Sequence, residues 1–254
     1  MWRVARASAT GTSHMQSDTP CQDRQAIGTV LSPDGATSLI AVIADGAGSA
    51  THSAEGAELV CHTLLELATA SLERNSDLDE LDDTIVRTWF AQVREALRAR
   101  CARDDLPMFD FSATAVLAIA GAQQTLCAQI GDGAIALRTS VDHSFQIAIW
   151  PQNGQYANET TFVTDPYAAE LVALYRTERV DDVILFSDGL ERVALDLAAK
   201  APFPKFVEPL ARFVRGEATL EEQLDAQLRA FIESAPINKR TDDDKSLIVA
   251  CRLP

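Results

Sequence analysis

The sequence lacks any long apolar run and any closely spaced pair of cysteines. No hydrophobic stretch approaches the ~20 residues that a helix needs to cross a bilayer, so we expect no membrane association. The five cysteines are odd in number and include no Cys-x-x-Cys pair. These features argue against a disulfide framework and against a zinc ribbon, and we expect reduced thiols that fill small apolar spaces.

Basic residues are also scarce, with 22 Lys and Arg against 37 Asp and Glu and a net charge of −15. A nucleic acid backbone requires a basic surface, so nucleic acid is excluded as a partner. The first residues contain no apolar stretch typical of a secretory signal, and we therefore expect a cytoplasmic protein. With 254 residues, 47% of them hydrophobic, we expect one domain spanning residues 1–254, and a monomer.

The sequence does contain four short aspartate motifs, each beside an apolar run that is typical of a buried strand. A buried carboxylate is costly unless it is paired or bound to a cation. The repeated pattern therefore predicts a shared metal site with the oxygen ligands that magnesium and manganese prefer. The motifs are Asp45 in LIAVIADGAGS, Asp132 in AQIGDGA, Asp188 in VILFSDGL and Asp243 in TDDDKSLIVAC, and a fifth candidate is Asp23 in PCQDR.

Two metal ions that share one carboxylate would need a residue able to bridge them. Asp45 is the best candidate, because the following Gly46 lets the backbone approach and offer its carbonyl oxygen. Taken singly, an Asp-Gly pair after a strand is more commonly a turn, and the run Asp242–Asp244 alone is typical of a solvated loop. The recurrence of the motif favours the metal site.

The hydrophobic pattern predicts an alternation of strand groups and helix groups. Hairpin-length links between consecutive strands indicate antiparallel sheets, and segregated helices indicate layers outside them. The order predicts an α+β fold, a four-layer αββα sandwich of two antiparallel sheets flanked by helices. The predicted strands are 2–10, 23–30, 38–44, 112–120, 125–130, 134–138, 144–149, 182–186 and 246–252, the helices are 57–68, 78–102, 190–200, 203–214 and 220–233, the loops are 11–22 and 151–159, and residues 160–180 are expected to hold one short strand with a helix or a further strand.

In their order, the motifs resemble those of the metal-dependent protein phosphatases of the type 2C class, and most of all a compact bacterial branch. The resemblance runs from Gly11 to Val249 through CQDR, VIADGAGS, FSATAVLAI, QIGDGAIAL, LFSDGL and DDKSLIVA. It implies a serine/threonine phosphoprotein phosphatase that uses two Mn²⁺ or Mg²⁺ ions. It also implies hydrolysis of phosphomonoesters by direct attack of a metal-bridging hydroxide, without a phosphoenzyme.

The same resemblance implies roles for individual residues. Asp23 would hold a metal-bound water, and Asp45 with the carbonyl of Gly46 would contact both main ions. Phosphoproteins would be the substrates, and a cognate serine/threonine kinase is a further expected partner. The implied metal ligands are Asp45, Gly46, Asp188, Asp243 and, for a third and weaker ion, Asp132.

The chain departs from the family pattern at three places. Gln22 stands where many members have glutamate, and Ala47 stands where the eukaryotic members have a proton-donating histidine. The phosphate-gripping arginine upstream of the first motif is absent, and Ser13 or His14 is the residue available in that stretch. His14 and His52 can each supply a proton or bind phosphate, and each can equally be an exposed residue without a role. We take His14 as the catalytic candidate.

These departures keep two alternatives open. One is a phosphatase-shaped module that binds phosphorylated partners with weak turnover or none. The other is a phosphatase with an aspartyl nucleophile, which the absence of an Asp-x-Asp start disfavours.

Overall fold

The computed structural model describes residues 1–31, 35–74, 78–152, 160–216 and 220–253. Within this part of the chain, no helix combines the length and the apolar character needed to cross a membrane. All five cysteines are free thiols, and four of them are buried. Residues 32–34, residues 75–77 between the first two long helices, and residues 153–159 of the expected 151–159 loop lie outside the described residues.

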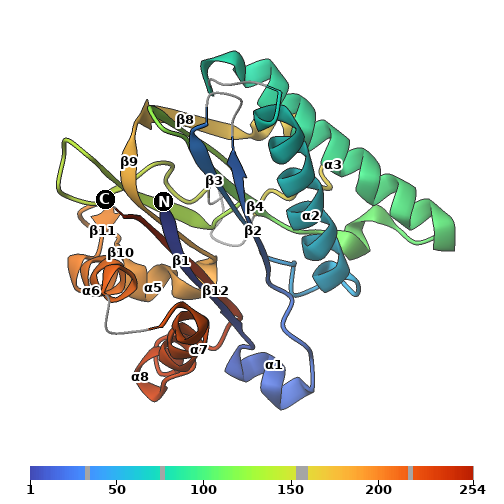
Figure 1. Ribbon diagram of the computed structural model, residues 1–254. Coiled ribbons are helices and arrows are strands. Elements are labelled where there is room, and N and C mark those ends of the chain that lie inside the picture. Colours follow the sequence, from blue (N-terminus) through green and yellow to red (C-terminus); the bar gives the residue numbers. More distant parts are fainter. Residues whose placement is uncertain (32–34, 75–77, 153–159, 217–219, 254) are drawn as a thin grey trace.

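Two five-stranded antiparallel sheets pack face to face (Figure 1). The first sheet has the order β1 (Trp2–Ala9), β12 (Lys245–Arg252), β9 (Val180–Phe186), β6 (Ala134–Thr139) and β7 (Gln146–Ile147). The second has the order β2 (Arg24–Leu31), β3 (Thr37–Ala44), β4 (Ala115–Ala120), β5 (Gln124–Ile130) and β8 (Ala173–Glu178).

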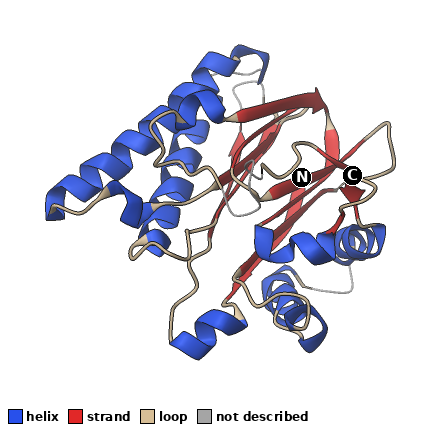
Figure 2. Ribbon diagram, turned by 180° about the vertical axis from the view of Figure 1, so that it is seen from behind, coloured by secondary structure: helices blue, strands red, loops and turns tan. Residues whose placement is uncertain are grey.

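Helices cover the outer face of each sheet, as both ribbon views show (Figures 1 and 2). The long helices α2 (Ser53–Leu72) and α3 (Asp83–Asp104) lie on the second sheet. The helices α6 (Pro204–Arg215) and α7 (Glu221–Ile232) lie on the first. This arrangement confirms the predicted αββα sandwich. The remaining short elements are α1 (Thr12–Ser17), α4 (Ala168–Leu171), α5 (Glu191–Ala194), α8 (Ala235–Asn238), the strand pair β10 (Leu195–Asp196) and β11 (Ala201–Pro202), and 3₁₀ turns at Leu78–Glu80, Met108–Phe111 and Asp188–Leu190.

The continuous apolar run of β3 follows from its burial on both faces. Leu39 and Ile43 belong to the core between the two sheets, whereas Ile40 and Val42 belong to the core beneath α2 and α3. Successive side chains of a strand point to opposite faces, so a strand covered on both sides carries no polar alternation.

Two predicted elements were wrong. The expected loop at 11–22 contains α1, a helix of polar residues whose sequence carries no apolar periodicity; the main-chain N–H of Ser13 holds it by donating to the carbonyl of Asp242. The expected helix at 190–200 is one helical turn followed by a two-strand hairpin. There the Asp196 carboxylate accepts the N–H groups of Ala198 and Ala199 and closes a turn, and Lys200 adopts a left-handed φ of 48°.

Other helices and strands have bounds that differ from the predicted ones. The second long helix starts at residue 83 because Asp82 caps it, its carboxylate accepting the N–H of Ile85 at 2.9 Å. Residues 160–180 hold the helix α4 and the strand β8, and the strand expected at 144–149 is reduced to the two residues of β7.

Candidate metal-binding active site

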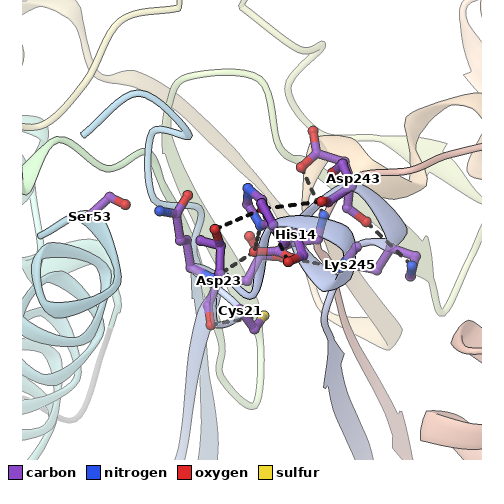
Figure 3. Close-up of polar contacts among 12 residues, drawn as sticks. His14, Cys21, Asp23, Ser53, Asp243 and Lys245 are labelled. Atoms are coloured by element: carbon purple, nitrogen blue, oxygen red, sulfur yellow. Dashed lines mark hydrogen bonds and ion pairs between the residues drawn. The ribbon is translucent and has the colours of Figure 1, made fainter. Parts of the chain in front are cut away.

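A cavity of about 160 Å³ opens at one end of the sandwich. Figure 3 shows part of its surroundings, with His14 drawn between Asp23 and Asp243. Asp23 is not among the lining residues, but its charge acts on Asp45, which is, and its Oδ2 accepts a hydrogen bond from the Ser187 hydroxyl. The predicted site residues that line the cavity are His14, Asp45, Gly46, Asp132, Asp188 and Asp243.

The strand register explains why residues so distant in sequence meet. β9 and β12 are antiparallel neighbours in which Phe186 pairs with Leu247, so the end of one strand lies beside the start of the other. Asp188 follows the first strand and Asp243 precedes the second, which puts both at the same edge. Asp45 directly follows β3 of the facing sheet.

The loop before β12 packs against two glycines. A Cβ on Gly189 would lie 1.8 Å from the carbonyl oxygen of Asp244, and a Cβ on Gly11 would lie 2.3 Å from the carbonyl carbon of Asp243. Any side chain at either position would push this loop away. The glycine of the LFSDGL motif therefore allows Asp188 and Asp243 to approach one another.

The carboxyl groups at the cavity destabilise one another's charged forms. Burial, followed by the charges of Asp23, Asp188 and Asp243, raises the pKa of Asp45 well above its usual value. Burial raises the pKa of Asp188 to about 7, with Asp132 and Asp243 adding to the shift. Burial also raises the pKa of Asp23 to about 6, against the lowering effect of hydrogen bonds from neighbours.

Positive charge is scarce around these groups. Among the described residues, no Lys or Arg forms an ion pair with Asp23, Asp45, Asp188 or Asp243. Lys245 is fully buried beside the loop, but its ammonium donates to Asn238 and to the main-chain carbonyl of Asp243. Acidic side chains are therefore concentrated at this site, and no described Lys or Arg neutralises them. A bound cation could supply the missing positive charge.

A hard divalent cation fits this donor set. The Oδ1 atoms of Asp23 and Asp188 and the Oε1 atom of Gln22 are buried without a hydrogen-bond partner. Among the described residues, no three His, Cys, Asp or Glu side chains are already arranged to hold a metal ion; Asp45 instead lies near Asp23 and Asp188, and burial together with their charges raises its pKa. A bound cation would replace the proton that this raised pKa favours.

Two hydroxyl groups orient the acids. The Ser187 hydroxyl donates to Oδ2 of Asp23 at 2.7 Å and accepts the N–H of Ser246 at 2.9 Å. The Thr160 hydroxyl donates to Oδ2 of Asp132 at 2.6 Å. Sequence reasoning missed both. Ser187 lies inside the LFSDGL motif and could have been singled out, whereas Thr160 follows a polar loop and carries no such signal.

Asp244 was also missed, because the acidic run 242–244 was interpreted as solvated. Its side chain is only 2% exposed. One carboxylate oxygen accepts the N–H of Gly11 and the other accepts the N–H of Gln22, both at 2.6 Å. The same second oxygen lies 3.0 Å from Nδ1 of His14. The interpretation of this residue as part of a solvated loop was wrong, since it ties α1 and the CQDR segment to the start of β12.

The two histidine candidates differ in their position relative to the cavity. His14 lies on α1 and is the only basic side chain lining the cavity in the described part of the chain. His52 does not line it; its ring stacks on Phe111 with ring centroids 5.0 Å apart. Gln22 and Ala47 both line the cavity.

Residues 10–231 match the family described as "Protein phosphatase 2C". The chain belongs to the protein phosphatase 2C family. Five of the six motifs lie within the matched residues, and DDKSLIVA follows them at residues 243–250.

Known members of the phosphatase 2C family resemble the chain over its whole length. The serine/threonine-protein phosphatase 3 of Escherichia coli (strain K12) is 34% identical over 254 residues, which cover 98% of each chain. Among solved structures, the serine/threonine phosphatase Stp1 from Staphylococcus aureus aligns with a TM-score of 0.64 at 17% identity, over 100% of this chain and 96% of that one. PppA, a regulatory component of the T6SS in Pseudomonas aeruginosa, aligns with a TM-score of 0.64 at 18% identity, over 99% of this chain and 98% of that one. At these identities the structures establish the fold.

Proposed function

We propose that this chain is a serine/threonine protein phosphatase that removes phosphate from phosphoproteins with the help of Mn²⁺ or Mg²⁺. The observation that carries the proposal is the convergence of unpaired carboxyl groups from β3, β9 and β12 around one cavity. Membership of the phosphatase 2C family and the 34% identity to a serine/threonine-protein phosphatase support it. The alternative of a binding module without turnover is not favoured by either comparison.

The proposed ligands follow the geometry of the cavity. Asp45, Asp188 and Asp243 would hold one ion, and Asp45 with the carbonyl of Gly46 would hold the second. Asp132, oriented by Thr160, would serve a weaker third ion. When bound, a divalent pair supplies positive charge that polarises the phosphoryl group and makes water a stronger nucleophile at neutral pH.

The chain's own residues then have separate tasks. Asp23 is held through Oδ2 by the Ser187 hydroxyl, and its unpartnered Oδ1 is free to accept a hydrogen bond from the attacking water. His14 faces the cavity, where Ala47 offers no proton, and would donate a proton to the departing serine or threonine oxygen. Direct attack of water on phosphorus requires no covalent intermediate with the protein.

The setting of this activity belongs to the same proposal. We place the phosphatase in the cytoplasm as a monomer with one domain over residues 1–254. Its partners would be phosphoproteins and a cognate serine/threonine kinase, as in other signalling phosphatases.

The test is hydrolysis of p-nitrophenyl phosphate and of phosphoserine or phosphothreonine peptides, with Mn²⁺ and Mg²⁺ titrated across the pH range. We expect metal-dependent release of phosphate from both substrates. The variant His62→Gln is a matched control, because His62 is exposed on α2 and contacts only Glu66 among charged groups. No phosphate release from either substrate at any metal concentration would overturn the proposal.

A further inference from the structure

Among the described residues that line the cavity, one side chain is able to carry a positive charge and five are aspartates. That side chain is His14, which is 17% exposed and lies on the polar helix α1. The Thr160 hydroxyl donates its proton to Asp132, and the Thr114 hydroxyl, which accepts the N–H of Asp45, is no stronger an acid than the departing serine or threonine alcohol. The imidazole is therefore the natural proton source for the departing oxygen.

His14 is held in place by Asp244. The Nδ1 atom of its ring is buried and lies 3.0 Å from Oδ2 of Asp244, which is itself 2% exposed. Nδ1 does not form an aligned hydrogen bond with that oxygen, so this is a close contact with poor alignment. Catalytic hydrogen bonds commonly become aligned only when substrate is bound. With Nδ1 turned inward, Nε2 on the opposite side of the ring is left for the cavity.

Asp244 is itself rigidly fixed. Each of its oxygens accepts a main-chain N–H at 2.6 Å, one from Gly11 at the start of α1 and one from Gln22. The carbonyl of the preceding Asp242 accepts both the N–H and the hydroxyl of Ser13. The bonds from Gly11 and Ser13 thus hold α1 against the loop before β12. Because His14 lies on α1, they also fix the position of its imidazole.

We propose that Asp244 is a positioning residue that holds His14 as the proton donor to the leaving oxygen of the substrate serine or threonine. This inference rests on the proposed phosphatase function and identifies which pair of residues handles the leaving group. A carboxylate at Nδ1 fixes the ring orientation and balances the charge of the doubly protonated imidazole.

Hydrolysis of the phosphate ester then involves one proton transfer from His14. Water adds its oxygen to phosphorus, and the bond between phosphorus and the substrate oxygen breaks with its electron pair on that oxygen. The proton on Nε2 of His14 moves to the oxygen, which leaves as an alcohol. The imidazole becomes neutral while Nδ1–H stays directed at Asp244, and solvent returns a proton to Nε2. The proton lost by the water passes to solvent or phosphate.

The test compares two leaving groups. An alkyl phosphate, as in a phosphoserine peptide, needs a proton to depart, whereas p-nitrophenolate leaves without one. For His14→Gln we expect kcat on the peptide to fall by about 10²-fold or more and kcat on p-nitrophenyl phosphate by less than ~3-fold. Asp244→Asn should lower the peptide-to-aryl ratio at least ~10-fold, and the double variant should show no further fall in the ratio. His62→Gln should keep the wild-type ratio.

The possible results distinguish failure of this inference from failure of the proposed phosphatase function. Equal losses on both substrates in an active protein would overturn the inference and leave the phosphatase function standing, because they indicate a structural or phosphate-gripping role. Additive losses in the double variant would overturn the role of Asp244. A wild-type chain inactive on both substrates would overturn the function and the inference together.

A second readout needs neither activity nor a folded Asp244 variant. Nitrogen-15 NMR of the imidazole rings in the wild-type protein, assigned with His14→Gln, reports which nitrogen of His14 carries a proton. We expect Nδ1 to be protonated at the assay pH. An Nδ1 without a proton would overturn the pairing with Asp244.

Discussion

The two ends of strand β9 each carry a buried aspartate, and their surroundings are opposite. Asp182, near the start of the strand, is fully buried between two arginines, with Nε of Arg138 at 2.5 Å and Nη2 of Arg215 at 2.6 Å. The first contact is an aligned hydrogen bond, and the second is a close ion pair with poorer alignment. Asp188, just past the end of the strand, faces Asp45 and Asp132.

The comparison separates structural from functional burial of charge. At the start of β9 the chain supplies its own cations, and Arg138 also reaches Glu208 on α6 at 2.9 Å, which ties the sheet to its covering helix. At the other end the chain supplies carboxyls without matching cations. A buried acid next to its own arginines is neutralised within the fold, and only its loss leaves a charge uncompensated, whereas a cluster of unmatched acids indicates a site for a cationic ligand.

The largest expected effect is loss of turnover when a cavity acid is neutralised. Asp45→Asn and Asp188→Asn each remove a proposed metal ligand, so we expect kcat/KM to fall by at least ~10³-fold, more than the ~10–100-fold typical of residues that only support a ligand. The assay is p-nitrophenyl phosphate hydrolysis at saturating Mn²⁺, with circular dichroism to confirm an unchanged fold. Retention of more than a tenth of the wild-type rate by both variants would contradict the account.

The next largest effect is expected on the stability of the fold, at the start of β9. Asp182→Asn removes the buried carboxylate that pairs with Arg138 and Arg215, although Arg138 keeps Glu208 and Arg215 is partly exposed, so we expect the free energy of unfolding to drop by about 1–3 kcal/mol. Asp188→Asn in metal-free protein should instead leave it unchanged or raise it slightly, because it removes repulsion. Urea unfolding in the presence of a chelator measures both. If the two variants were equally destabilised, the contrast between the ends of β9 would be wrong.

A smaller effect should appear in the pH dependence. The pKa values of Asp23 and Asp188 are raised to about 6 and about 7 from an ordinary value of 3.8. Their contribution to stability of the metal-free chain is fully present below about pH 4 and is lost as the pH rises through 6 and 7. Divalent cations must displace these protons, so the rise in Tm caused by Mn²⁺ should grow between pH 5 and pH 8 by ~3 °C or more. A metal-induced shift in Tm that is constant over this range would contradict the displacement of protons by the metal.

The smallest effect is expected at the edge of the cavity. Thr160→Ala removes the hydroxyl that orients Asp132, so we expect the Mn²⁺ concentration for half-maximal rate to rise by up to ~10-fold, with kcat little changed. Thr160→Ser keeps a hydroxyl and should behave like the wild type. A serine variant as impaired as the alanine variant would show that the methyl group matters and not the hydrogen bond.

Much of the fold could be predicted because its central strands are buried on both faces. The continuous apolar runs of β3 and β9 leave little choice of structure, and the aspartates that follow them identified the edge of the sheets where the cavity lies. α1 could not be predicted, since polar residues form it and tertiary contacts with the 242–244 loop hold it.

The part of the site that escaped prediction depends on tertiary burial. Nothing local distinguishes Asp244 from its exposed neighbours Asp242 and Asp243, because its burial arises from Gly11 and Gln22 folding over it. Thr160 likewise acquires its role only when the chain returns to the turn that carries Asp132. Hydrogen bonds between distant segments leave no periodic trace in the sequence.

Crystals grown or soaked with Mn²⁺ and measured at its absorption edge would locate the ions directly by anomalous scattering. The account predicts at least one strong peak at the edge of the two sheets, within about 2.5 Å of carboxylate oxygens of Asp45, Asp188 and Asp243. A clear map with no peak among these three side chains, in a protein shown to bind Mn²⁺, would contradict it.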